Sequence, residues 1–225
     1  KLGHAEYQLS EREPETGRAV YTFCMCPGGV VVPAASEEKS IVTNGMSYHS
    51  RAGDNANAAL VVSVDQRDFG SHPLDGVCFQ QAIERRAFAT VGDYCAPAQT
   101  VGHFMQNISG AEWGRVTPTY AIGVKPCNLS SILPSFVTEE MRKGLAVFER
   151  RIKGYAAPDA VLTAPETRTS SPVRIIRGDD LQSISTAGLY PCGEGSGYAG
   201  GIMSSAVDGI RTAGAVIERF CPPND

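Results

Sequence analysis

The segment from Gly188 to Arg219 places the strongest constraint on the fold, because a glycine-rich loop leads directly into a run of small and apolar residues. Its pattern predicts a short strand, a glycine loop and a helix over residues 201–219. Gly195, Gly197 and Gly200 have the G-x-G-x-x-G spacing of a dinucleotide-binding loop. That fingerprint also needs a further strand and an acidic residue about 20 positions later, and the sequence ends at Asp225. We therefore interpret the segment as a closing element of a fold, not as its first nucleotide-binding unit.

The chemistry of this segment favours an anionic or electron-rich ligand group. Consecutive glycines let backbone N–H groups approach a ligand closely, and the start of a helix supplies free donors and the positive end of its dipole. Small residues along the helix, such as Gly209 and Ala213, would allow close packing against a sheet. The alternative is a tight turn into the helix, in which the glycines serve packing alone.

Composition narrows the class of protein. Of the 225 residues, 42% are hydrophobic and 20% are charged, so the chain can bury the core of one large domain or two small ones. A net charge of −4 gives no basic surface for nucleic acid or an anionic membrane, and no apolar run approaches the roughly 20 residues of a membrane span. Seven scattered cysteines, an odd number, argue against a secreted disulfide framework. We expect a cytoplasmic protein that binds neither nucleic acid nor membrane.

Two β-hairpins are predicted in the first 64 residues. Residues 18–32 form two β-rich runs around the turn Pro27-Gly28-Gly29. Residues 40–43 and 58–64 form a second pair of β-rich runs, with Asn44-Gly45 as a tight turn.

Helices are predicted at two further places. Apolar residues recur at helical spacing over residues 74–91. Residues 138–154 give the clearest pattern, with Thr138 as the N-cap and Gly154 just beyond the end. Short strands at 160–163 and 173–178 flank a polar loop at 164–172. Hairpins and separated helices without regular βαβ alternation indicate an α+β fold.

The pair Cys24 and Cys26 has the closest spacing among the cysteines. On a regular strand both side chains would point to the same face. Three interpretations stay open: small structural hydrophobes, residues lining a substrate or flavin cavity, and a metal or redox pair. A structural zinc site needs a second pair of ligands, and none is visible in the sequence, so we predict no metal site.

Four motifs in a fixed order along the chain resemble those of one protein family. They are Phe23-Cys-Met-Cys-Pro-Gly-Gly29, Thr43-Asn-Gly-Met-Ser47, Glu166-Thr-Arg-Thr-Ser-Ser-Pro172, and Leu189-Tyr-Pro-Cys-Gly-Glu-Gly195 followed by Tyr198-Ala-Gly-Gly-Ile202. Together they resemble the bacterial family of uncharacterised FAD-dependent dehydrogenases, the NAD(FAD)-utilising dehydrogenases. The resemblance implies an inserted, β-rich and helical substrate-side domain at residues 1–158. The C-terminal closing part of a two-dinucleotide-type FAD-binding domain would follow at residues 159–225.

Members of that family also have an N-terminal FAD-binding half with its own G-x-G-x-x-G, and this sequence contains no counterpart. The resemblance thus implies a fragment of an FAD-dependent oxidoreductase that is inactive alone and holds FAD weakly or not at all. The implied partners are the missing N-terminal half and a small-molecule substrate, with NAD(P)H as a candidate electron donor.

The resemblance also implies a set of cofactor-binding residues. Glu194 would approach the ribityl and phosphate region of FAD, and residues 199–202 would face the pyrimidine edge of the flavin. The full implied set is Gly193, Glu194, Gly195, Gly197, Tyr198, Ala199, Gly200, Gly201, Ile202, Thr167, Arg168 and Ser171.

Hydride transfer needs no protein nucleophile, since the flavin carries the chemistry. If the inserted domain covers the flavin, the loops around Cys26 and residues 44–51 would lie over the ring. Arg51 could then bind an acidic substrate, and His49 or Tyr48 could exchange a proton. Each of these residues has an ordinary surface or packing role as its alternative.

Two other classes of function stay open. The chain could be a cofactor-free binding or interaction domain with a vestigial flavin motif, or a thiol redox protein that uses Cys24 and Cys26. No G-x-S-x-G, H-E-x-x-H or Walker-type motif is present, so hydrolase and nucleoside-triphosphatase functions have no support.

Overall fold

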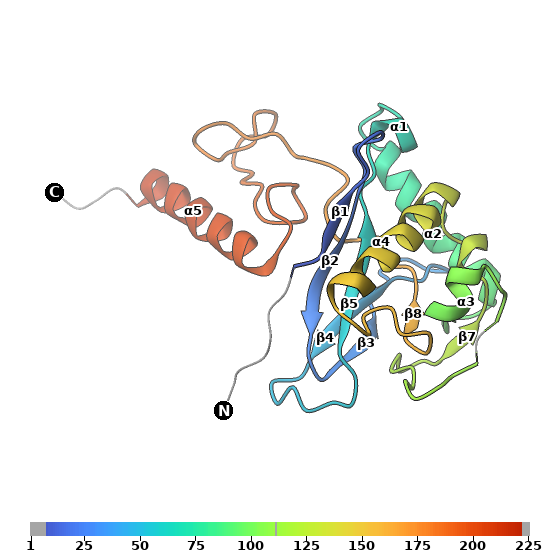
Figure 1. The fold of residues 1–225 in the computed structure, drawn as a ribbon. Coiled ribbons are helices and arrows are strands. Elements are labelled where there is room, and N and C mark those ends of the chain that lie inside the picture. Colours follow the sequence, from blue (N-terminus) through green and yellow to red (C-terminus); the bar gives the residue numbers. More distant parts are fainter. Residues whose placement is uncertain (1–7, 111, 222–225) are drawn as a thin grey trace. The chain divides into compact units, whose positions relative to one another are not determined.

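The computed structural model describes residues 8–110 and 112–221, and these divide into two compact units. Unit 1 comprises residues up to 68 and residues 80–167, and unit 2 comprises residues 69–79 and those from 168 onward. Over the described ranges the fold is mixed α+β, with small sheets and five α-helices (Figure 1). Unit 1 extends to Thr167, past the predicted boundary at 158; the functional division at that point stays a prediction.

The first sheet of unit 1 is antiparallel and has the order β1-β2-β5. Its strands are β1 (Ser10–Arg12), β2 (Ala19–Cys26) and β5 (Asn57–Val62). Helix α4 (Ser135–Arg151) lies against this sheet (Figure 1), and Leu9, Val20 and Phe148 form the buried core between them. Gly144 makes this contact possible, because a Cβ there would lie 2.6 Å from a methyl group of Val20.

The first predicted hairpin is wrong in its pairing. Strand β3 (Gly29–Pro33) does follow the Pro27-Gly28 turn, but it pairs with β4 (Thr43–Ser47) in a separate two-stranded sheet instead of with β2. Long-range bonds divert the chain: the Gly29 amide donates to the Asn55 carbonyl at 2.8 Å, and the Val31 amide donates to Thr119 Oγ1 at 2.9 Å.

The second predicted hairpin is also wrong. Asn44 and Gly45 lie inside strand β4 and form no turn. Strand β5 pairs with β2 instead, with Val61 opposite Tyr21. The stretch at residues 40–42 is buried but not a strand.

A third sheet has the order β7-β6-β8. Its central strand β6 (Ala96–Thr100) is buried at every position, pairs in parallel with β7 (Val124–Pro126) and pairs antiparallel with β8 (Val161–Thr163). Strand β8 confirms the strand predicted at 160–163. Helix α3 (Val101–Gln106) and a 3-10 turn, η1 (Leu129–Ser131), complete this region.

Both predicted amphipathic helices are present. Helix α2 (Asp75–Val91) confirms the first. Helix α4 starts three residues earlier than predicted, so the assignment of Thr138 as N-cap is wrong. Thr138 is buried in the first turn and its hydroxyl donates to the Ser135 carbonyl at 2.9 Å, while Pro134 occupies the cap, a residue type suited to the edge of a helix.

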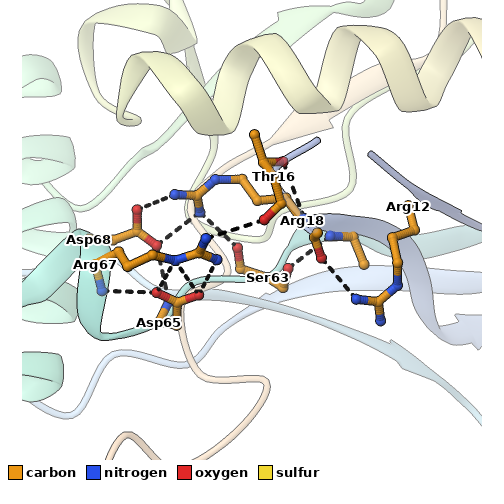
Figure 2. A network of polar contacts seen from close by, with 9 residues as sticks. Arg12, Thr16, Arg18, Ser63, Asp65, Arg67 and Asp68 are labelled. Carbon is orange, nitrogen blue, oxygen red and sulfur yellow. Dashed lines mark hydrogen bonds and ion pairs between the residues drawn. The ribbon is translucent and has the colours of Figure 1, made fainter. Parts of the chain in front are cut away.

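A polar network joins the short helix α1 (Gln66–Phe69) to the first sheet (Figure 2). Arg18 at the start of β2 forms an ion pair with Asp68, and the Arg18 guanidinium also donates to the Ser63 carbonyl at 3.2 Å. Ser63 Oγ accepts from the Ala19 amide at 2.8 Å. Asp65 pairs with Arg67 beside this network.

Unit 2 ends in helix α5 (Ile202–Phe220), which confirms the predicted C-terminal helix. The predicted strand at 173–178 and the strand before the glycine loop are wrong: residues 168–201 hold only an isolated bridge between Arg177 and Ser183. The backbone amides in this region donate to loop groups instead of to a neighbouring strand. The Ile175 amide donates to the Ser196 carbonyl, and the Arg177 amide donates to the Tyr198 hydroxyl.

Candidate functional site

Cys26 occupies a break in strand β2. A bulge lies between Phe23 and Cys26, and Cys24 has a left-handed φ of 49°. Cys24 is therefore exposed while Cys26 is partly buried, so the two side chains do not share a face as a regular strand would require. Cys26 lies opposite Asn57, the first residue of β5.

The environment of Cys26 opposes thiolate chemistry. Burial raises the pKa of the Cys26 thiol, a hydrogen bond with the Ser47 side chain lowers this pKa, and the charge of Glu166 raises it. A raised thiol pKa leaves little thiolate at neutral pH, which disfavours a redox pair. Among the residues that the structure describes, no three His, Cys, Asp or Glu side chains gather into a metal site.

Asn57 presents a buried amide without partners. Both Oδ1 and Nδ2 are buried, and neither forms a hydrogen bond with the residues that the structure describes. The amide lies over Gly45 of β4, where a Cβ would come within 2.1 Å of Oδ1 and 3.6 Å of the Cys26 sulfur. Gly45, predicted as a turn residue, thus makes room for Asn57 beside Cys26.

Glu166 lies close enough to Cys26 for its charge to affect the thiol. Its carboxylate is partly buried, and burial alone raises its pKa to about 7. Within the described ranges, no hydrogen bond or ion pair engages this carboxylate. Cys26, Ser47, Asn57 and Glu166, together with the backbone of Gly45, form what we call the Cys26 cluster; all belong to unit 1.

The other predicted catalytic residues lie on the loop that follows β4. Tyr48, His49 and Arg51 are exposed. The backbone of Arg51 lies against the turn after Cys26, since a Cβ on Gly28 would come within 2.2 Å of the Arg51 carbonyl. The structure therefore brings this loop to the Cys26 end of β2, with the His49 and Arg51 side chains in solvent.

The predicted cofactor-binding residues are divided between the units. Thr167 belongs to unit 1, where its hydroxyl donates to Glu84 at 2.6 Å and its carbonyl accepts from Gln80 at 2.8 Å. Arg168 and Ser171 belong to unit 2. The Ser171 hydroxyl lies 2.9 Å from the Val173 carbonyl and 3.2 Å from the Gly195 carbonyl, so it closes the glycine loop.

Arg177 and Asp208 hold the glycine loop in shape. Two guanidinium nitrogens of Arg177 contact the Asp208 carboxylate at 2.6 and 3.0 Å, and a third bond reaches the Pro191 carbonyl at 2.7 Å. Asp208 also accepts from the Gly193 amide at 2.9 Å. The hydrogen bond from Arg177 lowers the pKa of Asp208. Neither residue was singled out from the sequence, because a lone Arg and Asp in a loop and a helix carry no spacing signal.

Tyr198 is the aromatic centre of this loop. Its ring lies 3.7 Å from the Arg177 guanidinium carbon and 5.1 Å from that of Arg174. Arg174 also donates to the Gly197 carbonyl at 2.9 Å. Cation–π contacts with these two arginines hold the Tyr198 ring. Residues 199–201 then connect Tyr198 to α5.

At the N-terminus of α5, the first backbone N–H groups and the Ser205 hydroxyl have no hydrogen-bond acceptor within the described chain. Gly201 provides no side-chain cap, and the first helical bond runs from the Ser205 amide to the Gly201 carbonyl. The Ser205 hydroxyl is buried without a partner, and its Cβ lies 3.8 Å from a Cβ built on Gly193. Glu194 is partly buried nearby in the chain. Free amides and an orphaned hydroxyl beside glycines fit an electron-rich ligand group.

Helix α5 exposes its apolar face. Thr212 is its one buried residue, whereas Ile202 is 85% exposed and Ile210 is 72% exposed. The exposed α5 face consists of Ile202, Met203, Val207, Ile210, Ile217 and Phe220. Clustered exposure of large apolar side chains marks an interaction surface. No helix among residues 8–110 and 112–221 is long and apolar enough to cross a membrane.

Comparison with known proteins identifies the family. The family model described as "FAD-dependent protein, C-terminal domain-like" matches residues 1–169, a range that contains the Cys26 cluster and ends before the glycine loop. An uncharacterized protein from Clostridium beijerinckii is 52% identical over 225 residues, which cover 99% of this chain. The chain spans 42% of that relative's length. The chain therefore belongs to the FAD-dependent protein, C-terminal domain-like family.

Proposed function

We propose that the chain is the C-terminal part of an FAD-dependent oxidoreductase of the dehydrogenase type. The observation that carries the proposal is the family match over residues 1–169 together with the free donors at the start of α5. In this proposal residues 1–158 form the substrate side, and residues 159–225 close the FAD site.

The chain's own residues would hold the cofactor at the glycine loop. The amides of residues 202–204 and the Ser205 hydroxyl would donate to electron-rich flavin atoms, and Glu194 would accept from the ribityl chain. The Arg177–Asp208 ion pair would position this loop. Bound FAD would supply the acceptor for a substrate hydride.

Unit 1 would supply the substrate side. The exposed Arg51 can bind an acidic substrate group, and His49 can exchange protons with it. All seven cysteines are free, which supports a reducing, cytoplasmic location.

The remaining part of the same kind of polypeptide would cover the exposed α5 face. More than half of the Clostridium relative lies outside its match to this chain, and an FAD-binding portion there would supply the missing half of the cofactor site. Burying the apolar face of α5 against it would stabilise the joined protein. A second copy of the chain is the competing occupant.

Flavin content tests the proposal. The full-length Clostridium relative should purify yellow with one flavin per chain, whereas this chain alone should bind little or none. Serine replacements at the α5 face, such as Ile210→Ser, should lower flavin retention when made at the equivalent position of the relative, and Arg211→Ser should not. A colourless relative that takes up no added FAD would contradict the proposal and favour a cofactor-free binding domain.

Dimerisation of this chain through α5 would be detected by light scattering as a doubled mass that Ile210→Ser abolishes. That result would assign the exposed α5 face to a second copy and overturn its assignment to an FAD-binding portion.

A further inference from the structure

The Cys26 cluster holds polar groups that have no partner within the described chain. The two amide atoms of Asn57 are buried and unpaired, and the carboxylate of Glu166 makes no hydrogen bond or ion pair. Buried polar groups in folded proteins are almost always hydrogen-bonded, so each exception needs an explanation. The Asn57 amide is such an exception, and its position opposite Cys26, whose thiol senses the charge of the partly exposed Glu166, points to a ligand.

We propose that Asn57, Cys26 and Glu166 form a binding site for a neutral amide, that is, a carbonyl group beside an N–H group. The site itself stands on unit 1 alone. The identity of the natural ligand rests on the proposed function, in which the amide belongs either to a substrate or to the imide edge of a flavin.

The donor and acceptor of Asn57 select this chemistry. Its Nδ2 donates and its Oδ1 accepts, and the complementary edge is one that accepts and donates at neighbouring atoms. An amide or imide has that edge, whereas a ketone or ester lacks the donor. The Cys26 sulfur, on the strand opposite Asn57, offers a polarisable contact for the remainder of the ligand.

Glu166 restricts the ligand to neutral groups. An ionised Glu166 would repel a carboxylate ligand, and a protonated Glu166 would donate to the ligand carbonyl. Cys26 on β2 is the titratable group whose pKa the charge of Glu166 affects, and the next residue along the chain, Thr167, donates its hydroxyl to Glu84 on α2. Burial places the pKa of Glu166 at about 7, so the donating form is present below neutral pH.

Asn57 can reach such a ligand because no hydrogen bond holds its amide in place. The amide packs over Gly45, which has no side chain to retain it. Cys26 and Glu166 are partly exposed and form the side from which a ligand approaches. Turning the amide toward the ligand breaks no hydrogen bond and pairs both of its buried atoms.

Binding of benzamide to the 225-residue chain, measured by ligand-observed NMR, tests the proposal, with acetophenone as the probe that lacks the N–H group. Benzamide should bind and acetophenone should not. Above pH 7 the benzamide affinity should fall by about tenfold per pH unit, because only protonated Glu166 donates. Glu166→Gln, which donates at every pH, should bind benzamide without this pH dependence.

Asn57→Leu separates binding from folding. It should weaken benzamide binding at least about tenfold and raise the melting temperature by roughly 2–4 °C, because an unpaired buried amide is removed. Asn44→Leu, at an exposed asparagine of β4, should leave benzamide binding unchanged. A lower melting temperature of Asn57→Leu with undiminished benzamide binding would overturn the proposal, as would equal binding of acetophenone.

Lumiflavin distinguishes the two sources of the amide. Displacement of benzamide by lumiflavin from wild type but not from Glu166→Ala would assign the site to the flavin imide edge, and benzamide binding without displacement would assign it to a substrate amide. None of these measurements uses bound FAD, so failure here leaves the flavin-content test of the proposed function intact.

Discussion

The guanidinium of Arg18 donates from both of its terminal nitrogens to the two carboxylate oxygens of Asp68. Both side chains are largely buried, at 14% and 5% exposure. Arg18 also lies over the Phe136 ring, with its guanidinium carbon 4.2 Å from the ring centroid. Arg18, directly before β2, therefore contacts α1 through Asp68 (Figure 2) and α4 through Phe136.

Breaking this pair should destabilise unit 1. Arg18→Met leaves the Asp68 carboxylate buried without its partner and should lower the free energy of unfolding by about 3 kcal/mol in urea titrations. Arg67→Met removes the neighbouring exposed pair with Asp65 and should change the stability little. Equal effects of the two substitutions would show that burial does not set the strength of the Arg18 pair.

The same pair predicts how stability depends on pH. The hydrogen bond from Arg18 lowers the pKa of folded Asp68, so its stabilisation is complete above the unfolded value and is lost as pH falls through the folded value. The difference in unfolding free energy between wild type and Asp68→Asn should therefore shrink below about pH 4. A difference that stayed constant down to pH 2 would contradict the lowered pKa.

Two helix glycines should respond oppositely to alanine. Gly144→Ala forces a methyl group into Val20 and should destabilise the chain by about 2 kcal/mol through overpacking. A Cβ on Gly209 of α5 meets nothing within 4 Å, so Gly209→Ala should stabilise the helix by about 0.5–1 kcal/mol. Chemical denaturation measures both, and a stabilising Gly144→Ala would contradict the close approach of α4 to β2.

Loss of Arg177 should loosen the glycine loop. Arg177→Gln removes the partner of Asp208, which also accepts from the Gly193 amide, so hydrogen exchange over residues 193–198 should become at least about tenfold faster. Arg219→Gln, whose contact with Asp180 is 4.0 Å long, serves as the matched control and should leave that exchange unchanged. Unaltered exchange in Arg177→Gln would show that the loop is held by other contacts.

Glu166 should control the reactivity of Cys26. The negative charge of Glu166 raises the pKa of the Cys26 thiol, so Glu166→Gln should lower this pKa and speed alkylation of Cys26 by iodoacetamide at pH 8. Peptide mass spectrometry reports the rate at each cysteine. Asp54→Asn removes an exposed charge from the loop after β4 and should not alter the rate at Cys26; an equal acceleration there would point to a general charge effect.

The spacing of apolar residues along the sequence predicted the helices, whose hydrogen bonds join residues close together in the chain. Helices α2, α4 and α5 carry their apolar residues at helical spacing, and these were found with errors of a few residues at most. The early start of α4 was missed because Phe136 and Val137 extend its apolar pattern before Thr138, the residue that looked like a cap.

Strand pairing depended on contacts that the sequence does not display. The Pro27-Gly28 turn was placed correctly, but its partner in space is the stretch from Arg51 to Asn55. Asn44-Gly45 resembles a hairpin turn, yet Gly45 lies in β4, where it pairs with Val31 of β3, and Asn57 fills the space that a side chain at Gly45 would need. Neighbours distant in sequence thus decided which strands pair, β2 with β5 and β3 with β4.

The candidate site was predicted in part. Cys26 was named from its spacing and lies in the cluster, whereas Asn57 was missed because burial without a partner has no sequence signature. Glu166 had a usable sequence signal, because it opens one of the four motifs; the structure places it directly after the buried Ala164 and Pro165. The roles of the glycine-loop residues stay predictions.

Strand β8 sets the order in which the chain can assemble during synthesis. Central strand β6 is flanked by β7 and by β8, so that Ala98 pairs with Thr163. On the ribosome, which releases the chain from its N-terminus, this sheet stays incomplete until residue 163 has emerged. The Arg177–Asp208 ion pair of the glycine loop can form only later, because both of its residues follow the last strand of the sheet. Translation therefore makes the third sheet available for folding before the loop and helix that we assign to the cofactor.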